Sequence, residues 1–326
     1  MKIQAVSAVT KTVSYCTGFG LELEVFSSPE TMPEMIVDGG CITNDAGYNL
    51  AEFITNPSAS LSETLTILRR LVDVEEDVWF TSKRPPCLLH NANKWQKAKR
   101  YDALRAALEI ERPGHRYLVN QMTERAALHI NLSGDFNPFG DDGAFLVNFF
   151  NEAALYVAAA IHREIDNSYG HLSIWRDFAR DERLPKFGRW FATGGEMRKY
   201  IESTPKLLAE KTFEPLPEGQ TLSIESRLDL STLWWFARPK VNDGGAVYME
   251  FRLLPSMPLS LVEKYSRLVV EMVESLLNWY HGPNRSNPVT SRRQLSEVYQ
   301  SLPDVPARYL PKGPMSHVRW VSLFRC

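Results

Sequence analysis

Gly20-Leu21-Glu22-Leu23-Glu24-Val25 alternates leucine with glutamate, and this alternation decides the fold class. Successive side chains of a β-strand point to opposite faces of a sheet, so Glu22 and Glu24 share one face and the two leucines share the other. The segment therefore predicts a strand with an apolar back and an acidic front.

Three further segments repeat this pattern. They are Asn49-Leu50-Ala51-Glu52-Phe53-Ile54, Ala127-Leu128-His129-Ile130-Asn131-Leu132 and Val247-Tyr248-Met249-Glu250-Phe251-Arg252-Leu253. Four such strands predict a sheet whose front carries carboxylates, a histidine and an arginine. A solvated sheet face without any site is the alternative, because antiparallel sheets commonly alternate polar and apolar residues. The recurrence of acids and a histidine, with no interleaved lysine, favours a site.

Composition narrows the class of protein. The 326 residues are 44% hydrophobic and 11% aromatic, which is enough for a substantial core, and the net charge of −2 gives no basic field for nucleic acid. The four cysteines have no C-x-x-C spacing, so neither a zinc knuckle nor a disulfide framework is indicated. No stretch approaches 18 uncharged apolar residues. We expect a single cytoplasmic domain over residues 1–326, with no membrane or nucleic-acid partner.

Helical periodicity separates the predicted strands. Amphipathic or mostly apolar patterns predict helices over residues 61–72, 94–109, 143–165 and 262–280, the first of them with a capping box at Ser60 and Glu63. Strands and helices alternate irregularly, with no Rossmann or P-loop glycine pattern. The predicted fold class is α+β, with helices covering one face of a sheet.

Cations are expected among the carboxylates on the front of the predicted sheet. Carboxylates crowded on one face repel one another and raise their pKa values unless cations sit among them. Oxygen-rich sites with one imidazole suit Mg²⁺ or Mn²⁺ with open positions for phosphate oxygens. Arg252, on the face of Glu250, is placed to contact a transferring phosphoryl group. Together these residues predict phosphoryl transfer from a nucleotide.

With these motifs in order, the chain resembles the glutamate-cysteine ligase and carboxylate-amine ligase superfamily. Gly20 to Glu24 is similar to the family's G-x-E-x-E strand, and His129 to Ser133 is similar to its H-x-N-x-S strand. Trp234 to Pro239, followed by Glu250-Phe251-Arg252, resembles the W-W-x-x-R-P and E-x-R signature of the carboxylate-amine ligases. Ile174-Trp175-Arg176-Asp177 resembles a segment of the plant-type ligases.

This resemblance implies a glutamine synthetase-like α+β fold, with a curved, mainly antiparallel sheet, a concave polar active-site face and helices on the convex face. It also implies an ATP-dependent ligase that forms an amide through an acyl phosphate, with ATP and two or three Mg²⁺ or Mn²⁺ ions as cofactors. The substrates would be a small carboxylate, such as glutamate or a related amino acid, and an amine from cysteine, another amino acid, a specialised metabolite, a peptide or a protein.

The resemblance also assigns roles to residues. It implies that the metal ligands are Glu22, Glu24, Asp45, Glu52, His129 and Glu250. It implies that the catalytic residues are Arg252, Arg238 and Glu250, and that the substrate contacts are Asn131, Arg176 and Trp235. Two alternatives stay open: Arg238 forms a salt bridge on a loop before the final strand, and Trp235 packs in the core.

Two departures from the motifs of the ligase family leave the identity of the substrate open. Ser168-Tyr169-Gly170 stands where the plant-type ligases have S-Y-R, so a substrate-binding arginine is absent there, and Arg176 and Arg180 are candidates to compensate. Leu253-Leu254-Pro255-Ser256 replaces a segment that ends in aspartate. The other hypotheses for this fold are a nucleotide- or metabolite-binding module without turnover and a guanidino-type kinase.

A basic C-terminal extension starts at about residue 283. It carries Arg285, Arg292, Arg293, Arg308, Lys312, Arg319 and Arg325 against only Glu297 and Asp304. A basic edge that packs over the acidic sheet face is one interpretation. The other is that Arg292 or Arg293 reaches the nucleotide phosphates.

Overall fold

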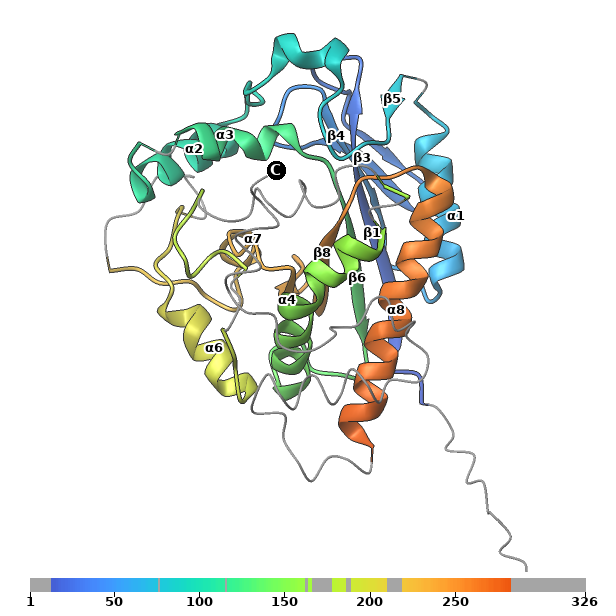
Figure 1. Cartoon of the computed structure of the whole chain (residues 1–326), viewed down its shortest axis with the longest axis vertical. Helices are drawn as coiled ribbons and strands as arrows, with labels where there is room; N and C mark the ends of the chain where they lie inside the picture. The colour runs from blue at the N-terminus through green and yellow to red at the C-terminus, as the bar shows by residue number, and fades with distance from the viewer. Residues whose placement is uncertain are drawn as a thin grey trace, which may run out of the picture.

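The computed structural model describes residues 13–75, 77–114, 116–161, 164–165, 178–185, 189–209 and 219–282. In these residues one antiparallel sheet of eight strands is covered by helices, which confirms the mixed α and β class (Figure 1). The order of its strands is β2-β3-β4-β1-β6-β8-β7, and β5 pairs separately with β1. The predicted segment around Arg176 and the basic extension from 283 lie outside the described residues.

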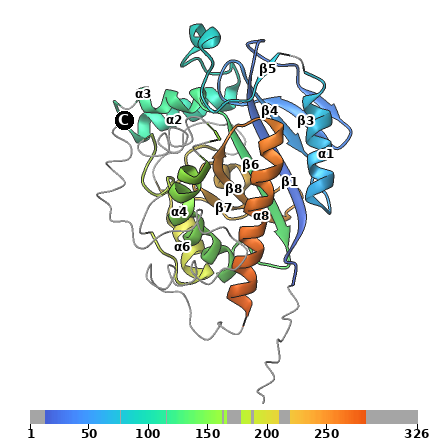
Figure 2. The same ribbon diagram turned by 45° about the vertical axis from the view of Figure 1, so that its right-hand side comes forward.

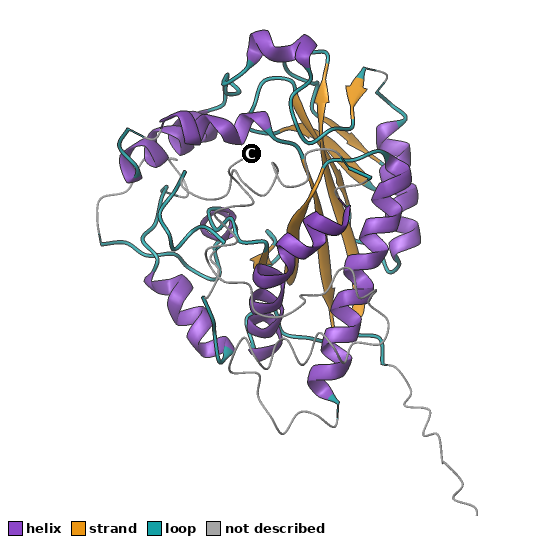
Figure 3. Cartoon of the chain, in the orientation of Figure 1, coloured by secondary structure: helices purple, strands orange, loops and turns teal. Residues whose placement is uncertain are grey.

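All four predicted strands are present, and Figure 3 shows them in one sheet. The strands are β1 Cys16–Ser27, β2 Met35–Val37, β3 Gly40–Asn44, β4 Leu50–Thr55, β5 Val78–Trp79, β6 Ala127–Gly134, β7 Ala237–Val241 and β8 Val247–Pro255. β4 begins one residue later than predicted because Asn49 has a φ of 62°, which is incompatible with a strand.

The register places the polar residues on one face. Glu22 of β1 is opposite Ile54 of β4 and His129 of β6, while Glu24 is opposite Glu52. The residues that alternate with them are buried on the other face, as predicted: Leu21, Leu23, Leu128, Ile130, Leu132, Met249 and Phe251. In β8 the register shifts after Phe251, so Leu254 rather than Leu253 is opposite Leu128, and Leu253 is buried as well. In β8 the alternation read from the sequence therefore holds up to Phe251.

Three helices pack on this apolar face. They are α1 Leu61–Val72 against β1 and β4, α4 Asp141–Ile161 against β7 and β8, and α8 Leu259–His281 against β6 (Figure 2). The remaining helices are α2 Lys99–Glu111, α3 Arg116–Asn120, α6 Gly194–Ser203 and α7 Arg227–Ser231, with 3₁₀ turns η1 Pro86–Asn91 and η2 Gln121–Glu124. None of the helices in the described ranges is both long and apolar enough to cross a membrane.

The helix predictions were right in position and less accurate at their ends. α1 has the predicted bounds, with the Ser60 hydroxyl accepting a hydrogen bond from the Glu63 backbone N–H. α2 begins at Lys99 rather than at residue 94, because the chain before it runs beside residues 46–48 and bonds to their backbone. α4 spans 141–161 rather than 143–165, and α8 extends the prediction at both ends.

Candidate active site

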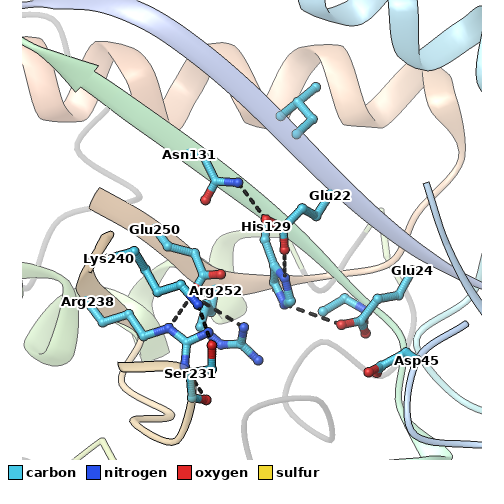
Figure 4. A network of polar contacts seen from close by, with 12 residues as sticks. Glu22, Glu24, Asp45, His129, Asn131, Ser231, Arg238, Lys240, Glu250 and Arg252 are labelled. Carbon is cyan, nitrogen blue, oxygen red and sulfur yellow. Dashed lines mark hydrogen bonds and ion pairs between the residues drawn. The ribbon is translucent and has the colours of Figure 1, made fainter. Parts of the chain in front are cut away.

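Five residues form an acidic half of the polar face: Glu22, Glu24, Asp45, Glu52 and His129. Figure 4 shows Glu22, Glu24, Asp45 and His129 of this group. His129 lies between two of the carboxylates. Its Nδ1 is 3.2 Å from Glu22 Oε2, and its Nε2 is 3.5 Å from Glu24 Oε1. The ring is buried and held on both sides, so its orientation is fixed before any ligand binds.

Neighbouring groups fix the two glutamates of β1 as well. Asn131 Nδ2 donates a hydrogen bond of 2.8 Å to Glu22 Oε1. The backbone N–H of Ala127 donates one of 2.8 Å to Glu24 Oε2. At the edge of this half, the hydroxyl of Tyr101 from α2 lies 3.4 Å from Asp45 Oδ1. The acidic half is therefore a preorganised cluster rather than a set of solvated side chains.

The crowded acids differ in the direction in which their pKa values are shifted. Burial, and then the charge of a neighbouring acid, hold the pKa values of Glu24 and Glu52 well above their ordinary value; that neighbour is Asp45 for Glu24 and Glu22 for Glu52. Burial is the largest influence on the pKa of Glu22 and would raise it, but the hydrogen bond from His129 and the charges of His129 and Lys240 together lower that pKa. Burial, followed by the charge of Arg252, lowers the pKa of His129, so its ring is neutral at physiological pH.

The acidic half offers a donor set that fits a divalent cation. One ligand atom each from Glu22, Glu52 and His129 lies within 4.8 Å of the other two. Two carboxylates and a neutral imidazole match the preference of Mg²⁺ or Mn²⁺ for few protein ligands and open positions.

The cationic half of the same face lies on β7 and β8 (Figure 4). It consists of Arg238, Lys240, Glu250 and Arg252. Arg238 is directly opposite Glu250 in the register and hydrogen-bonds its carboxylate, and Arg252 Nη1 lies 3.4 Å from Glu250 Oε2. Burial disfavours the Glu250 charge, but Arg238, Arg252 and Lys240 hold the pKa of Glu250 well below its ordinary value.

Sequence patterns missed Lys240. It is buried on β7, its Nζ donates a hydrogen bond of 2.8 Å to Ser231 Oγ, and burial and the charge of Arg238 lower its pKa to about 8. The sequence offered one signal for Lys240: it stands two residues after Arg238, so the two side chains share one face of the strand. With Lys240, three cations surround one carboxylate, so this half carries positive charge beside the acidic half.

The geometry bears on the predicted roles of Arg238 and Glu250. Arg238 lies in β7 rather than on a loop, and its guanidinium bonds Glu250 and the carbonyl oxygens of Leu230, Ser231 and Leu233. Arg238 therefore holds the Glu250 carboxylate, and its predicted catalytic role stays a prediction. The Glu250 carboxylate lies beside two guanidinium groups, and its predicted role as a metal ligand stays a prediction as well.

Trp235 is not at the site. Its ring is completely buried, packs beside Phe191, and donates its indole N–H to the carbonyl oxygen of Glu182 at 3.1 Å. A ring without exposed surface cannot contact a substrate, so packing in the core is its role. Asn131, by contrast, lies between Gly20 and Glu250 in the register and joins the two halves.

The raised pKa values of Glu24 and Glu52 predict how stability depends on pH. A carboxyl group whose pKa is higher in the folded state binds more protons when folded, so stability falls as pH rises from about 4.5 through the raised value. Mg²⁺ replaces those protons and is expected to stabilise the protein more at pH 8 than at pH 6. At 100 times its dissociation constant the gain is about 2.7 kcal/mol.

Melting temperatures at both pH values, with and without Mg²⁺, measure this effect. Glu52→Gln is expected to reduce both the fall in melting temperature as pH rises and the increase in melting temperature caused by Mg²⁺. The matched control is Glu271→Gln, which changes an exposed glutamate of α8. Equal Mg²⁺ stabilisation of the parent and of Glu52→Gln would exclude Glu52 from the metal site.

Comparison with known proteins identifies the fold. The structure matches glutamate-cysteine ligase of Francisella tularensis, solved in complex with AMP, with a TM-score of 0.53 and 15% identity over 88% of this chain and 70% of that one. It also aligns with a bifunctional glutathione synthetase from Pasteurella multocida, with a TM-score of 0.45 and 13% identity over 86% of this chain and 40% of that one. No family model and no curated protein matches the sequence.

The fold is therefore that of this glutamate-cysteine ligase, and the resemblance suggested by the motifs agrees with it at the level of the fold.

Proposed function

We propose that this chain is an ATP- and Mg²⁺-dependent ligase that joins a carboxylate to an amine through an acyl phosphate. The observation that carries the proposal is the division of one sheet face into two halves. The metal-fitting set of Glu22, Glu52 and His129 lies beside the arginine-held Glu250. Phosphoryl transfer needs both halves. A metal held by the acidic half would bind the anionic phosphates, and the arginines of the cationic half would stabilise the charge on the transferring group.

The nucleotide assignment rests on the fold and on these charges. The glutamate-cysteine ligase with this fold was solved with AMP. When bound, Mg²⁺ would neutralise the phosphate oxygens of ATP, with Glu22, Glu52 and His129 as the residues that would hold it. Glu24, whose pKa the charge of Asp45 raises, would with Asp45 be the candidate ligands of a second ion.

The reaction has two bond exchanges. An oxygen of the substrate carboxylate attacks the γ-phosphorus of ATP, and the bond to ADP breaks. The amine nitrogen then attacks the acyl carbon, phosphate leaves with the bonding electrons, and the amine loses a proton. Arg252 is the guanidinium on the face of the site that contacts the transferring phosphoryl group, and Arg238 holds Glu250 in place.

The substrates are small molecules in this proposal. Glutamate or a related amino acid supplies the carboxylate, and an amino acid, a specialised metabolite or a peptide supplies the amine. Asn131 orients the substrate: its amide N–H is occupied by Glu22, while Oδ1 has no hydrogen-bond partner in the part of the chain that the structure describes. That oxygen is available to a donor on the substrate.

Hydroxylamine trapping tests the function. Incubation of the protein with MgATP, hydroxylamine and a panel of amino acids is expected to yield a hydroxamate and ADP in equal amounts, because hydroxylamine intercepts an acyl phosphate. Mass spectrometry identifies the carboxylate that reacted, and then the amide formed with each amine. Omission of Mg²⁺ is expected to abolish both products.

Other outcomes would replace the proposal. ADP and a phosphorylated guanidine without hydroxamate would indicate a kinase. Mg²⁺-dependent stabilisation by ATP with no ADP formed from any carboxylate would indicate a binding module.

A further inference from the structure

Residues 83–100, between β5 and the start of α2, carry only positive charge. They contain six lysine and arginine residues and no aspartate or glutamate, in a protein whose net charge is −2. Two of the six have a local role, since Arg84 is buried against Glu124 and Arg100 stacks on the ring of Tyr101. The other four are exposed, and we call them the basic rim: Lys83, Lys94, Lys97 and Lys99.

The basic rim has no matching acids in the ranges that the structure describes. None of its four lysines forms an ion pair there. Asp102, the first acid that follows the rim in the sequence, lies 3.7 Å from Arg105 of the same helix instead. The surfaces of soluble proteins usually mix both signs of charge, so a run of unmatched lysines is suited to a partner that supplies the anions.

The backbone of the basic rim is held in place by buried contacts. The carboxylate of Glu124 accepts hydrogen bonds from the backbone N–H of Asn93 at 2.6 Å and from Arg84 Nε at 3.0 Å, so it joins the two ends of the rim. Asn91 is buried, and its Nδ2 donates a hydrogen bond of 2.8 Å to Asn49 Oδ1. A surface that is ordered before binding loses less conformational freedom when a partner docks.

The basic rim borders the acidic half of the candidate site. The carbonyl oxygen of Lys94 accepts a hydrogen bond of 3.0 Å from the backbone N–H of Tyr48, and the N–H of Gln96 donates one of 2.8 Å to the carbonyl oxygen of Ala46. Both contacts fall on the loop that follows the predicted metal ligand Asp45. A partner on the rim would therefore lie beside the acidic half.

The composition of residues 83–100 favours a polypeptide partner over a nucleic acid or a membrane. Trp95 is their only tryptophan, tyrosine or phenylalanine, and it is buried, so no such ring is free for a base to stack on. The rim itself consists of lysines, whereas the planar fork of arginine suits bidentate binding of phosphate. Leu89 is the one large apolar side chain of the stretch that is exposed, which is little surface for insertion into a bilayer.

We infer that the basic rim docks an acidic segment of a peptide or protein whose amine the ligase acylates. This inference rests on the proposed ligase function, because it takes the site beside the rim to be the place where the amine reacts. Complementary charge would guide the acidic segment to the rim and would hold the amine near the site. The acceptor is then a polypeptide rather than a free amino acid.

Fluorescence anisotropy of two labelled peptides tests the docking without turnover. The probes are hexaglutamate and hexaglutamine, each labelled at the C-terminus so that the amine stays free. At about 50 mM NaCl the parent is expected to bind hexaglutamate at least 10-fold more tightly, and about 300 mM NaCl is expected to remove most of this preference. The combined variant Lys94→Gln, Lys97→Gln and Lys99→Gln is expected to bind hexaglutamate about 10-fold more weakly.

A matched control removes three exposed charges elsewhere. The combined variant Arg198→Gln, Lys199→Gln and Arg267→Gln changes α6 and α8, and it is expected to weaken hexaglutamate binding less than about 3-fold. Both combined variants are expected to melt with the parent, because all six side chains are exposed. Equal binding of the two peptides by the parent, or equal weakening by the two combined variants, would overturn the inference.

Amide formation tests whether the docked peptide is the substrate. With the carboxylate found by hydroxylamine trapping, the rim variant is expected to raise the KM for hexaglutamate as the amine about 10-fold and to leave the KM for glycinamide unchanged. Acylation of glycinamide but not of hexaglutamate would overturn the inference and leave the ligase function standing. Failure of the ligase function itself shows as no hydroxamate from any carboxylate, whatever the peptides bind.

The other kinds of partner have their own outcomes. Tighter binding of a labelled RNA hairpin than of hexaglutamate, lost in the rim variant, would assign the rim to nucleic acid. Binding to phosphatidylserine vesicles without binding to hexaglutamate would assign it to a membrane surface. Either result would overturn the inference.

Discussion

Arg252→Met is expected to lower kcat for hydroxamate formation about 10³-fold, with a smaller change in the KM for MgATP. An arginine that stabilises charge on a transferring phosphoryl group acts mainly in the transition state, and its removal costs about 10³ to 10⁵ in kcat. Arg252 is suited to this role because its guanidinium stands between Glu250, at 3.4 Å, and the acidic half, whose charges reach it. Steady-state kinetics at saturating MgATP measure the effect.

The matched control is Arg267→Met, which removes an exposed arginine of α8 that pairs with Glu263 at 2.9 Å. It is expected to leave kcat unchanged. Arg252→Lys keeps the charge without the planar fork and should recover part of the rate. If Arg252→Met retains more than a tenth of the parent kcat and the parent melting temperature, Arg252 does not contact the phosphoryl group.

Arg238→Met is expected to destabilise the protein by about 3 to 5 kcal/mol, the usual cost of removing one partner of a buried ion pair. Arg238 is 3% exposed and Glu250 is 1% exposed, so neither charge has water to replace its partner. The change also leaves the carbonyl oxygens of Ser231 and Leu233 without their donor. Urea-induced unfolding followed by tryptophan fluorescence gives the free energy of unfolding.

Arg227→Met provides the comparison, since it breaks an exposed pair with Asp243 of 2.6 Å. Its cost is expected to be below about 1 kcal/mol. Adding Glu250→Gln to Arg238→Met should restore part of the loss, because it removes the charge left unpaired. Equal losses in the free energy of unfolding for Arg238→Met and Arg227→Met would show that the buried pair of Arg238 and Glu250 does not stabilise the sheet.

Local alternation was enough to predict the strands and much of the site. A strand with period two fixes which residues share a face, so Glu22 was correctly placed with Glu24 from the sequence alone. That Glu52 and His129 meet Glu22 within one cluster depends on the register between strands, which alternation does not specify. The resemblance to a ligase family supplied that step, and the match of fold agrees with it.

Contacts between distant segments explain what the sequence did not predict. Residues 94–98 have helical spacing, but pairing with residues 46–48 holds them in an extended conformation. Lys240 acquires its role by packing beside Arg238 across from β8.

The strand order has a consequence for the way the protein folds. Residues up to Gly134 contain every member of the acidic half, whereas the cationic half comes from β7 and β8, more than 100 residues later in the chain. During synthesis the N-terminal strands therefore leave the ribosome long before β8 can pair with β6. Contacts this distant in sequence close slowly, and an unfinished sheet exposes the edge of β6 to other chains. Until β8 docks, the acids of the N-terminal strands lack the arginines that face them in the folded protein.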